Sequence, residues 1–149
     1  MNIGDICSRA VVSIGVNDPV RQAAEMMRNY HVGSLVVTES RDGGLMPVGM
    51  LTDRDIVVGI VAKDVDPLTV TVGDIMSSDP LIAAEDDDVG EILEDMRKEG
   101  VRRIPVVDET DKLIGIFALD DLLQMLAVQM DLVAGIVGSQ RLEETRLRA

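Results

Sequence analysis

The sequence has almost no aromatic side chains: among its 149 residues there is no tryptophan, one phenylalanine and one tyrosine. Hydrophobic residues nevertheless make up 46% of the chain, so a core of Val, Ile, Leu, Met and Ala is available. The nine methionines supply flexible side chains that fill irregular spaces in such a core. Length and composition together predict one compact body.

Cysteine and histidine are equally scarce, with one residue of each, Cys7 and His31. A single cysteine excludes an internal disulfide and is typical of a reducing cytosol. These two residues do not form a metal-ligand set, and the sequence offers no base–nucleophile pair and no cofactor-binding lysine. The sequence therefore predicts neither a metal site nor an enzyme.

Basic residues are few as well, 14 against 27 acidic ones, which gives a net charge of −13 and a pI of about 4.3. Such a surface repels nucleic acid and anionic membranes, so any basic site must be local. The N-terminus shows no signal peptide, and the apolar run 56–62 is too short to span a bilayer. The longer stretch 122–138 carries Gln124, Gln129 and Asp131. We expect a soluble cytoplasmic protein with neither nucleic acid nor membrane as a partner.

The chain contains an internal repeat. Residues 4–38 align with residues 73–107 without a gap, and GDICS then falls on GDIMS. Further along, GMLTDRD (49–55) aligns with GIFALDD (115–121). Units of about 60 residues bury too little surface to be stable alone, so the two repeats are expected to pack into one body.

Each repeat is predicted to fold as strand–helix–strand–strand–helix, a mixed α/β (α+β) class. Strands are expected near 11–14, 34–39, 47–51, 81–84, 104–109 and 113–117, and helices near 19–30, 53–62, 88–99 and 120–130. The domain limits are repeat 1 at 3–62, a linker at 63–72, repeat 2 at 73–127 and a helical tail at 128–149. Asp18 as N-cap and Pro19 as first helical residue mark one helix start, Asp86 to Asp88 mark the next, and Gly100 marks its end.

The segment Thr52–Asp55 has two interpretations. A threonine followed three residues later by an acid, before an apolar run, is a capping box that satisfies free amides at a helix start. The same groups also suit a ligand, because a hydroxyl and a helix N-terminus bind phosphate while a carboxylate binds the two hydroxyls of a ribose. Gly49 would let the backbone approach such a ligand closely.

These marks resemble the cystathionine-β-synthase (CBS) domain family. The resemblance covers about residues 3–127 and is carried by GDIMS, PVRQAAEMMRNYHVGSLVV, VGEILEDMRKEGVRRIPVVD and GMLTDRD. It implies a stand-alone tandem pair packed about a pseudo-twofold axis, with two clefts between the repeats. It also implies that the clefts hold an adenine nucleotide such as AMP, ADP or ATP, or a related adenosyl ligand.

Carried over residue by residue, the resemblance implies a ligand site on the first repeat. Its Gly-x-x-Thr-x-x-Asp element is complete, whereas the second repeat keeps Asp121 but has Ala118 and Ile82 where the first has hydroxyls. We therefore expect one dominant site per chain. The candidate ligand-binding residues are Ser13, Gly49, Thr52, Arg54, Asp55, Arg102, Arg103, Ile104, Pro105 and Asp121.

The tail is more apolar than one small module requires. Apolar side chains recur at helical spacing from Leu122 to Val133, interrupted by Gln129, so we expect this face to hold a homodimer. The predicted role is a regulatory sensor that binds adenine nucleotide and signals to an unknown effector protein. The alternative is a constitutive dimeric scaffold with empty clefts, which the loss of the hydroxyl at Ala118 favours for one cleft.

Overall fold

The chain divides into two units, residues 1–117 and residues 118–149, and a computed structural model describes every residue of both. The larger unit contains the body of the mixed α/β fold. The smaller unit is built by a single helix, α6 (Leu119–Arg148).

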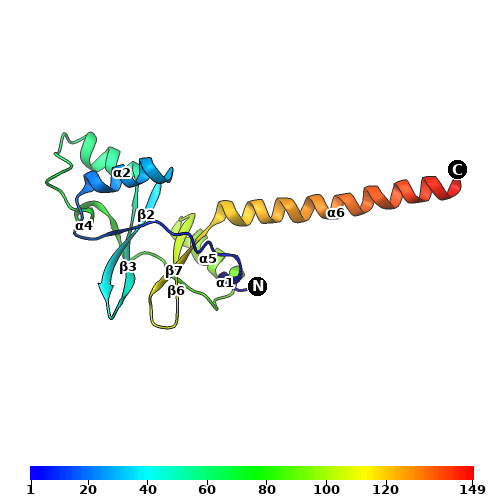
Figure 1. Ribbon diagram of the computed structural model, residues 1–149, viewed down its shortest axis with the longest axis horizontal. Helices are drawn as coiled ribbons and strands as arrows, with labels where there is room; N and C mark the ends of the chain where they lie inside the picture. Colours follow the sequence, from blue (N-terminus) through cyan, green and yellow to red (C-terminus); the bar gives the residue numbers. More distant parts are fainter. The chain divides into compact units, whose positions relative to one another are not determined.

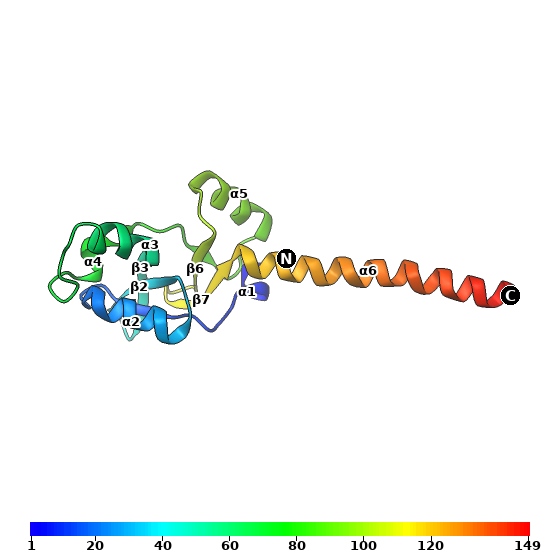
Figure 2. The ribbon, with the colours of Figure 1, turned by 90° about the horizontal axis from the view of Figure 1, so that it is seen from above.

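The predicted element order of both repeats is confirmed. The first repeat contains α1 (Ile3–Ile6), β1 (Ser13–Gly15), α2 (Val20–Tyr30), β2 (Ser34–Arg41), β3 (Gly44–Thr52), α3 (Asp53–Ile56) and the π-helix η1 (Val57–Val61). The second contains α4 (Val72–Ile75), β4 (Ser77–Ser78), β5 (Ala83–Ala84), α5 (Val89–Glu99), β6 (Arg103–Val107) and β7 (Leu113–Ala118). In the view from above, α2 lies beside β2 and β3, and β6 lies beside β7 (Figure 2).

The first sheet has the order β1-β2-β3-β4. β1 runs parallel to β2, while β2 and β3 form the predicted antiparallel hairpin. The fourth strand, β4, comes from the second repeat and pairs with β3 through Gly49 and Met50. The second sheet has the order β5-β6-β7, again with its first strand parallel to its second.

The core of the first repeat lies between α2 and one face of this sheet. Val20, Ala23 and Met27 are buried at the three- and four-residue spacing of a helix face. The core cluster contains Ile14, Ala23, Met27, Leu35, Val37, Leu51 and Val72. The helix α5 buries Val89, Ile92 and Met96 at the same helical spacing.

The ends of the two long repeat helices are equivalent. α2 ends at His31 with φ 55°, and α5 ends at Gly100 with φ 67°, both in the left-handed conformation. Asp88 caps α5 by accepting from the amides of Gly90 and Glu91. The prediction for Asp18 was wrong: its carboxylate accepts instead from the amide of Gly15 at 2.9 Å.

Pro19 therefore occupies the N-cap of α2, and the helix begins at Val20 rather than at the proline. The carboxylate of Asp18 stabilises the turn that follows β1, which leaves it unable to cap the helix.

The first helix of the second repeat, its entry helix α4, packs on the first repeat. The amide of Val72 in α4 donates to the carbonyl of Asp18 at 2.8 Å, and that of Gly73 donates to Val16 at 2.9 Å. The linker expected at 63–72 therefore leads directly into a helix that packs on repeat 1. Figure 1 shows α4 beside α2.

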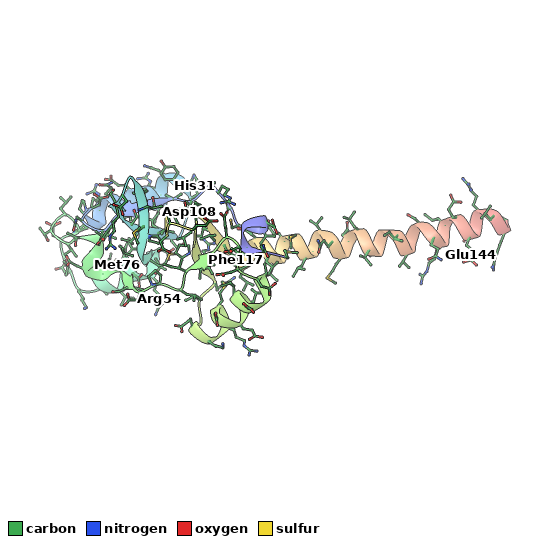
Figure 3. The ribbon with its side chains drawn as sticks, turned by 90° about the horizontal axis from the view of Figure 1, so that it is seen from below. His31, Arg54, Met76, Asp108, Phe117 and Glu144 are labelled. Carbon is green, nitrogen blue, oxygen red and sulfur yellow. The ribbon has the colours of Figure 1, made fainter.

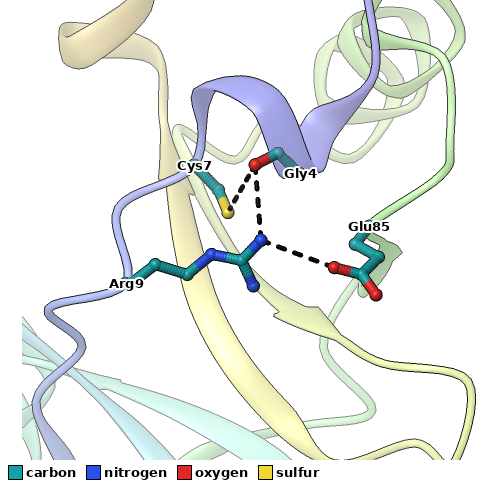
Figure 4. Close-up of polar contacts among 4 residues, drawn as sticks. All are labelled: Gly4, Cys7, Arg9 and Glu85. Atoms are coloured by element: carbon teal, nitrogen blue, oxygen red, sulfur yellow. Dashed lines mark hydrogen bonds and ion pairs between the residues drawn. The ribbon is translucent and has the colours of Figure 1, made fainter.

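In the same way the entry helix of the first repeat, α1, packs on the second repeat. The amide of Ile3 in α1 donates to Asp87 at 2.9 Å, and that of Gly4 donates to Glu85 at 2.7 Å. Arg9 joins the same contact, because its guanidinium reaches the carbonyl of Gly4 and the carboxylate of Glu85, both at 3.4 Å (Figure 4). Each sequence repeat therefore does not pack by itself, because the entry helix of the other repeat, α1 or α4, packs on it.

Glycines make this exchange sterically possible. A Cβ on Gly4 would lie 2.8 Å from the carbonyl oxygen of Glu85, and one on Gly73 would lie 3.0 Å from that of Val16. Where the strands meet, a Cβ on Gly49 would lie 2.8 Å from the oxygen of Ser77, and one on Gly115 would lie 2.7 Å from that of Ser8. A side chain at any of these positions would force the facing backbone to move.

The two hairpins also touch. Asp108 closes the β6–β7 turn by accepting from the hydroxyl and amide of Thr110, each at 2.8 Å, and these bonds lower the pKa of its carboxyl group. From this turn the ammonium of Lys112 donates to the carbonyl of Arg41 in the first hairpin.

Two predicted helices differ from expectation. The helix expected at 53–62 is the short α3 followed by the π-helix η1, in which the amide of Ala62 donates five residues back to Val57. The helix expected at 120–130 does not end there. It continues as α6 to Arg148, because no proline or cap interrupts the apolar run and glycines at 135 and 138 are tolerated.

By length and composition alone, α6 is long and apolar enough to cross a membrane, with a mean hydropathy of 1.5 over 18 residues. One such helix is weak evidence for a membrane span. The expected absence of a membrane partner therefore stays a prediction.

The close contact between Gly49 and the backbone of Ser77 can be tested by substitution. Gly49→Ala should lower the free energy of unfolding by about 1–3 kcal/mol, because the backbone of Ser77 must move to admit the methyl group. Urea unfolding measures the change. The matched control is Gly59→Ala, whose methyl group would meet Ile75 only at 3.7 Å, an ordinary contact. Equal stability of the two variants would contradict the steric explanation.

Candidate functional site

The segment predicted to bind a ligand lies where β3 ends and α3 begins. The hydroxyl oxygen of Thr52 accepts from the amide of Asp55 at 3.2 Å, and Oδ2 of Asp55 accepts from the amide of Thr52 at 2.9 Å. The predicted capping box is therefore present. Both side chains are partly buried, which limits their rotation.

The capping box leaves part of the hydrogen-bonding capacity of Thr52 and Asp55 unused. It uses the oxygen of Thr52 as an acceptor, so the hydroxyl proton is not consumed by it. It also uses only Oδ2 of Asp55, so Oδ1 takes no part. The structural interpretation and the ligand-binding interpretation are compatible, because the box fixes the orientation of the two groups that a ligand would need.

The presence of glycine at position 49 is explained by close packing between chain segments, which the sequence did not reveal. Gly49 is buried in β3 opposite Ser78 of β4, and the sulfur of Met76 and the carbonyl of Ser77 occupy the space that a side chain would need. The close approach at Gly49 is therefore one between two chain segments. Nothing in its contacts requires a ligand.

Arg103 reaches the first repeat from the second. Its guanidinium donates to the hydroxyl of Ser34 at 3.4 Å, and Ser34 pairs with Thr52 across β2 and β3. Cross-strand partners on one face of a sheet lie within about 5.5 Å of each other. Arg103 of the second repeat thus bonds to the cross-strand partner of Thr52 in the first repeat. We call Ser34, Thr52, Asp55 and Arg103 the Thr52 site.

The other predicted residues of the second repeat have different surroundings. Ile104 is 1% exposed and Pro105 is fully buried, so their side chains belong to the core of β6. Arg102 immediately precedes β6 and is exposed. Arg54 in α3 is also exposed, and Figure 3 labels it at the surface.

Ser13 is not brought next to Thr52. It lies in β1 opposite Val36, and Val36 in turn pairs with Met50, so β2 separates Ser13 from β3. Two strand spacings amount to about 9–10 Å. Ser13 lines a separate cavity of about 560 Å³ together with Asp18, Gln22 and other residues of the first repeat.

Asp121 belongs to the smaller unit, in the first turn of α6, where it is exposed. Ala118 at the N-cap of that helix makes no side-chain bond, unlike Thr52 at the corresponding position. The hydroxyl that orients the first-repeat carboxylate therefore has no counterpart here.

One residue of the Thr52 site escaped the sequence analysis. Ser34 has no recognisable motif, but it occupies the repeat position of Arg103, as the alignment of residues 4–38 with 73–107 shows. Equivalent residues of a pseudo-twofold pair contact each other only near the axis, and the sequence alone did not show that this pair lies there. No group of three or more His, Cys, Asp or Glu side chains is arranged to hold a metal.

The family model for the CBS domain matches residues 3–62 and 72–128. The chain belongs to the CBS domain family. CBS domain pairs are generally regulatory modules that bind small ligands.

An uncharacterized protein of Methanopyrus kandleri is 34% identical over 125 residues, which is 84% of this chain and 62% of the relative. The chain thus spans less than two thirds of that relative. Hypoxic response protein 1 of Mycobacterium tuberculosis is 33% identical over 122 residues, 82% of each chain.

Solved structures agree with this assignment. A crystal structure of Hypoxic Response Protein I with two coordinated zinc ions is 32% identical, with a TM-score of 0.71 over 83% of this chain and 98% of the other. The CBS domain pair of protein MJ0100, in complex with 5′-methylthioadenosine and S-adenosyl-L-methionine, is 23% identical with a TM-score of 0.73. The match covers 87% of this chain and 98% of the other. At this identity it shows only that the two chains share a fold.

The capping role of Thr52 can be measured apart from any ligand. Thr52→Val keeps the volume but removes the acceptor, so the free energy of unfolding should fall by about 0.5–2 kcal/mol. Thr52→Ser should restore most of it, because the hydroxyl returns. Urea unfolding of both variants checks this. Equal stability of Thr52→Val and Thr52→Ser would show that the box contributes nothing.

Proposed function

We propose that the Thr52 site binds an adenine nucleotide, AMP, ADP, ATP or a related adenosyl ligand, and that the protein is a sensor without catalytic activity. The observation that carries the proposal is the position of Arg103, at 3.4 Å from Ser34 and so beside the cross-strand partner Thr52. In a chain of net charge −13, an anionic ligand needs such a local cation.

Each group has a role in this proposal. The hydroxyl proton of Thr52 and the guanidinium of Arg103 bind phosphate oxygens, and Oδ1 of Asp55 accepts from the ribose hydroxyls. The MJ0100 complex shows that a CBS pair of this fold can hold adenosyl compounds.

Binding is proposed to act on the relation between the two repeats. Thr52 and Asp55 belong to the first repeat and Arg103 to the second, so a ligand held by all three favours one relative arrangement of the two. An effector protein that distinguishes those arrangements would receive the signal. We place the protein in the cytoplasm, where such nucleotides occur.

The scaffold alternative rests on a specific observation. The capping box at Thr52 and the close chain contact at Gly49 explain both residues without a ligand. Thermal shift against AMP, ADP, ATP and S-adenosylmethionine separates the two functions, since a ligand at 100 times its dissociation constant adds about 2.7 kcal/mol of stability. No shift with any of them would favour the scaffold.

The carboxylate gives the sharpest test of ribose binding. Asp55→Ala should weaken AMP binding by about 1.5–3 kcal/mol, roughly 10- to 100-fold, because charge-assisted bonds to the ribose are lost. Calorimetry measures the affinity. Asp74→Ala is the matched control, since Asp74 accepts from the amide of Thr71 at 3.0 Å in a second capping box.

Asp74→Ala and Asp121→Ala should leave AMP affinity nearly unchanged, with about one tight site per chain. The Asp55→Ala loss should shrink with 2′,3′-dideoxy-AMP, which has no ribose hydroxyls. Undiminished AMP binding by folded Asp55→Ala, or loss only on mutating Asp121, would refute the assignment to the first repeat.

Arg103 should act on the phosphate and not on the nucleoside. Arg103→Gln is expected to weaken AMP by about 1.5–3 kcal/mol while changing adenosine binding little, because the cation faces the phosphate. Calorimetry with both ligands, at two salt concentrations, checks this. An equal loss for AMP and adenosine would indicate that the substitution disturbs the site as a whole.

A further inference from the structure

The second unit contains an apolar surface that nucleotide binding does not explain. The family model ends at residue 128, yet α6 continues to Arg148. Most of the apolar side chains from Leu123 onward are exposed, Leu126 at 44% and Met130 at 74% among them. Figure 3 shows side chains on all sides of this helix, with Glu144 labelled toward its end. Soluble monomers rarely expose so much contiguous apolar surface.

Six apolar residues of α6 follow a heptad pattern. They are spaced alternately four and three residues apart, the spacing that keeps one seam facing a partner helix. The seam consists of Leu119, Leu123, Leu126, Met130, Val133 and Val137. No polar residue interrupts it over nearly three heptads.

The polar residues of the same stretch lie off the seam. Gln124 and Asp131 are seven residues apart and follow seam positions directly, which turns them by about 100° from it. In a bilayer, Asp131 would lie near the middle of the apolar run 122–138, where an aspartate costs about 2.5–3.5 kcal/mol. That run is about 25 Å long as a helix, shorter than the roughly 30 Å hydrocarbon layer. A protein partner suits this helix better than a membrane.

We propose that α6 pairs in parallel and in register with α6 of a second copy of this chain. In that register each of the six seam residues meets its own counterpart, so every layer from Leu119 to Val137 is apolar, and the polar layers at Gln140 and Glu144 follow only beyond the seam. The antiparallel register with Leu123 opposite Gln140 would also place Leu119 opposite Glu144, so polar side chains would enter its outer layers. A shorter antiparallel overlap, with Leu123 opposite Val133, keeps the layers apolar but leaves residues 138–148 without a partner helix. Parallel pairing also brings Glu143 of one copy near Arg148 of the other, opposite charges at the flanking positions of the heptad.

The pairing goes beyond the proposed function and does not depend on a nucleotide. The sequence predicted a dimer held by the tail; the structure adds a continuous helix, a defined seam and an orientation. Parallel pairing places the 1–117 units of both copies at the same end of the helix pair. Two nucleotide sites would then be carried by one dimer.

Two valines of α6 provide a matched test of the seam. Val133 lies on it and Val128 lies off it, and they are 63% and 60% exposed. Val133→Asp should weaken dimerisation by more than about tenfold, because each chain then carries a charge into the seam. Val128→Asp should change it by less than about twofold. Sedimentation equilibrium of the full chain, without detergent, measures both.

Disulfide cross-linking tests the orientation, in a Cys7→Ser background. Leu123→Cys and Val137→Cys should each form linked dimers on mild oxidation, because in-register residues of a parallel pair come within the 4.4–6.8 Å Cα separation that a disulfide needs. Asp131→Cys, off the seam, should not. In the antiparallel register the two residues at 123 would be about 25 Å apart.

Several results would overturn the proposal. A wild-type chain that sediments as a monomer at high micromolar concentration would do so, as would equal effects of the two valine substitutions. A dimer that neither Leu123→Cys nor Val137→Cys can cross-link would exclude parallel pairing. Flotation of wild type with phosphatidylcholine vesicles, lost equally in both valine variants, would assign α6 to a membrane instead.

Discussion

The exchange of entry helices between the repeats is the interaction on which the rest of the structure depends. α4 packs on the first repeat and brings β4 against β3, while α1 packs on the second and brings Ser8 against Ile116. Each contact joins backbone to backbone at distances that only glycine permits, at Gly4, Gly73, Gly49 and Gly115. These glycines recur at equivalent positions because the same close contact is made twice.

The Thr52 site follows from this arrangement and from the pseudo-twofold relation of the repeats. Packing the repeats together places Arg103 against Ser34, its own repeat counterpart, at 3.4 Å. A serine in one repeat and an arginine in the other make the pair asymmetric, so the positive charge comes from one side only. The capping box orients the side chains of Thr52 and Asp55 at the end of the strand that pairs with Ser34.

Much of the fold could be predicted because its signals are local. Apolar runs on either side of a polar turn located β2 and β3, the Asp-Pro pair at 18–19 located α2 to within one residue, and Gly100 marked the end of α5. Strand order is not local, so the sequence did not show that β2 lies between Ser13, a candidate taken from the family resemblance, and Thr52. The docking of α1 on the second repeat was also invisible, since GDICS reads the same whichever repeat it contacts. Asp18 was misread because a carboxylate beside a helix start can bond to the preceding turn as well as to the helix.

The exchange also constrains how the chain can fold during synthesis. β3 is completed by Ser77 and Ser78, and α1 docks on residues 85 and 87, so neither surface finds its partner while only the first repeat has been made. Until the second repeat leaves the ribosome, the edge of β3 that β4 will cover is a bare strand edge, able to pair with another chain. Both contacts can form only once residues 77–87 have been made. Residues 3–62, although a clear unit of sequence, therefore lack the strand and the docking surface that complete their packing.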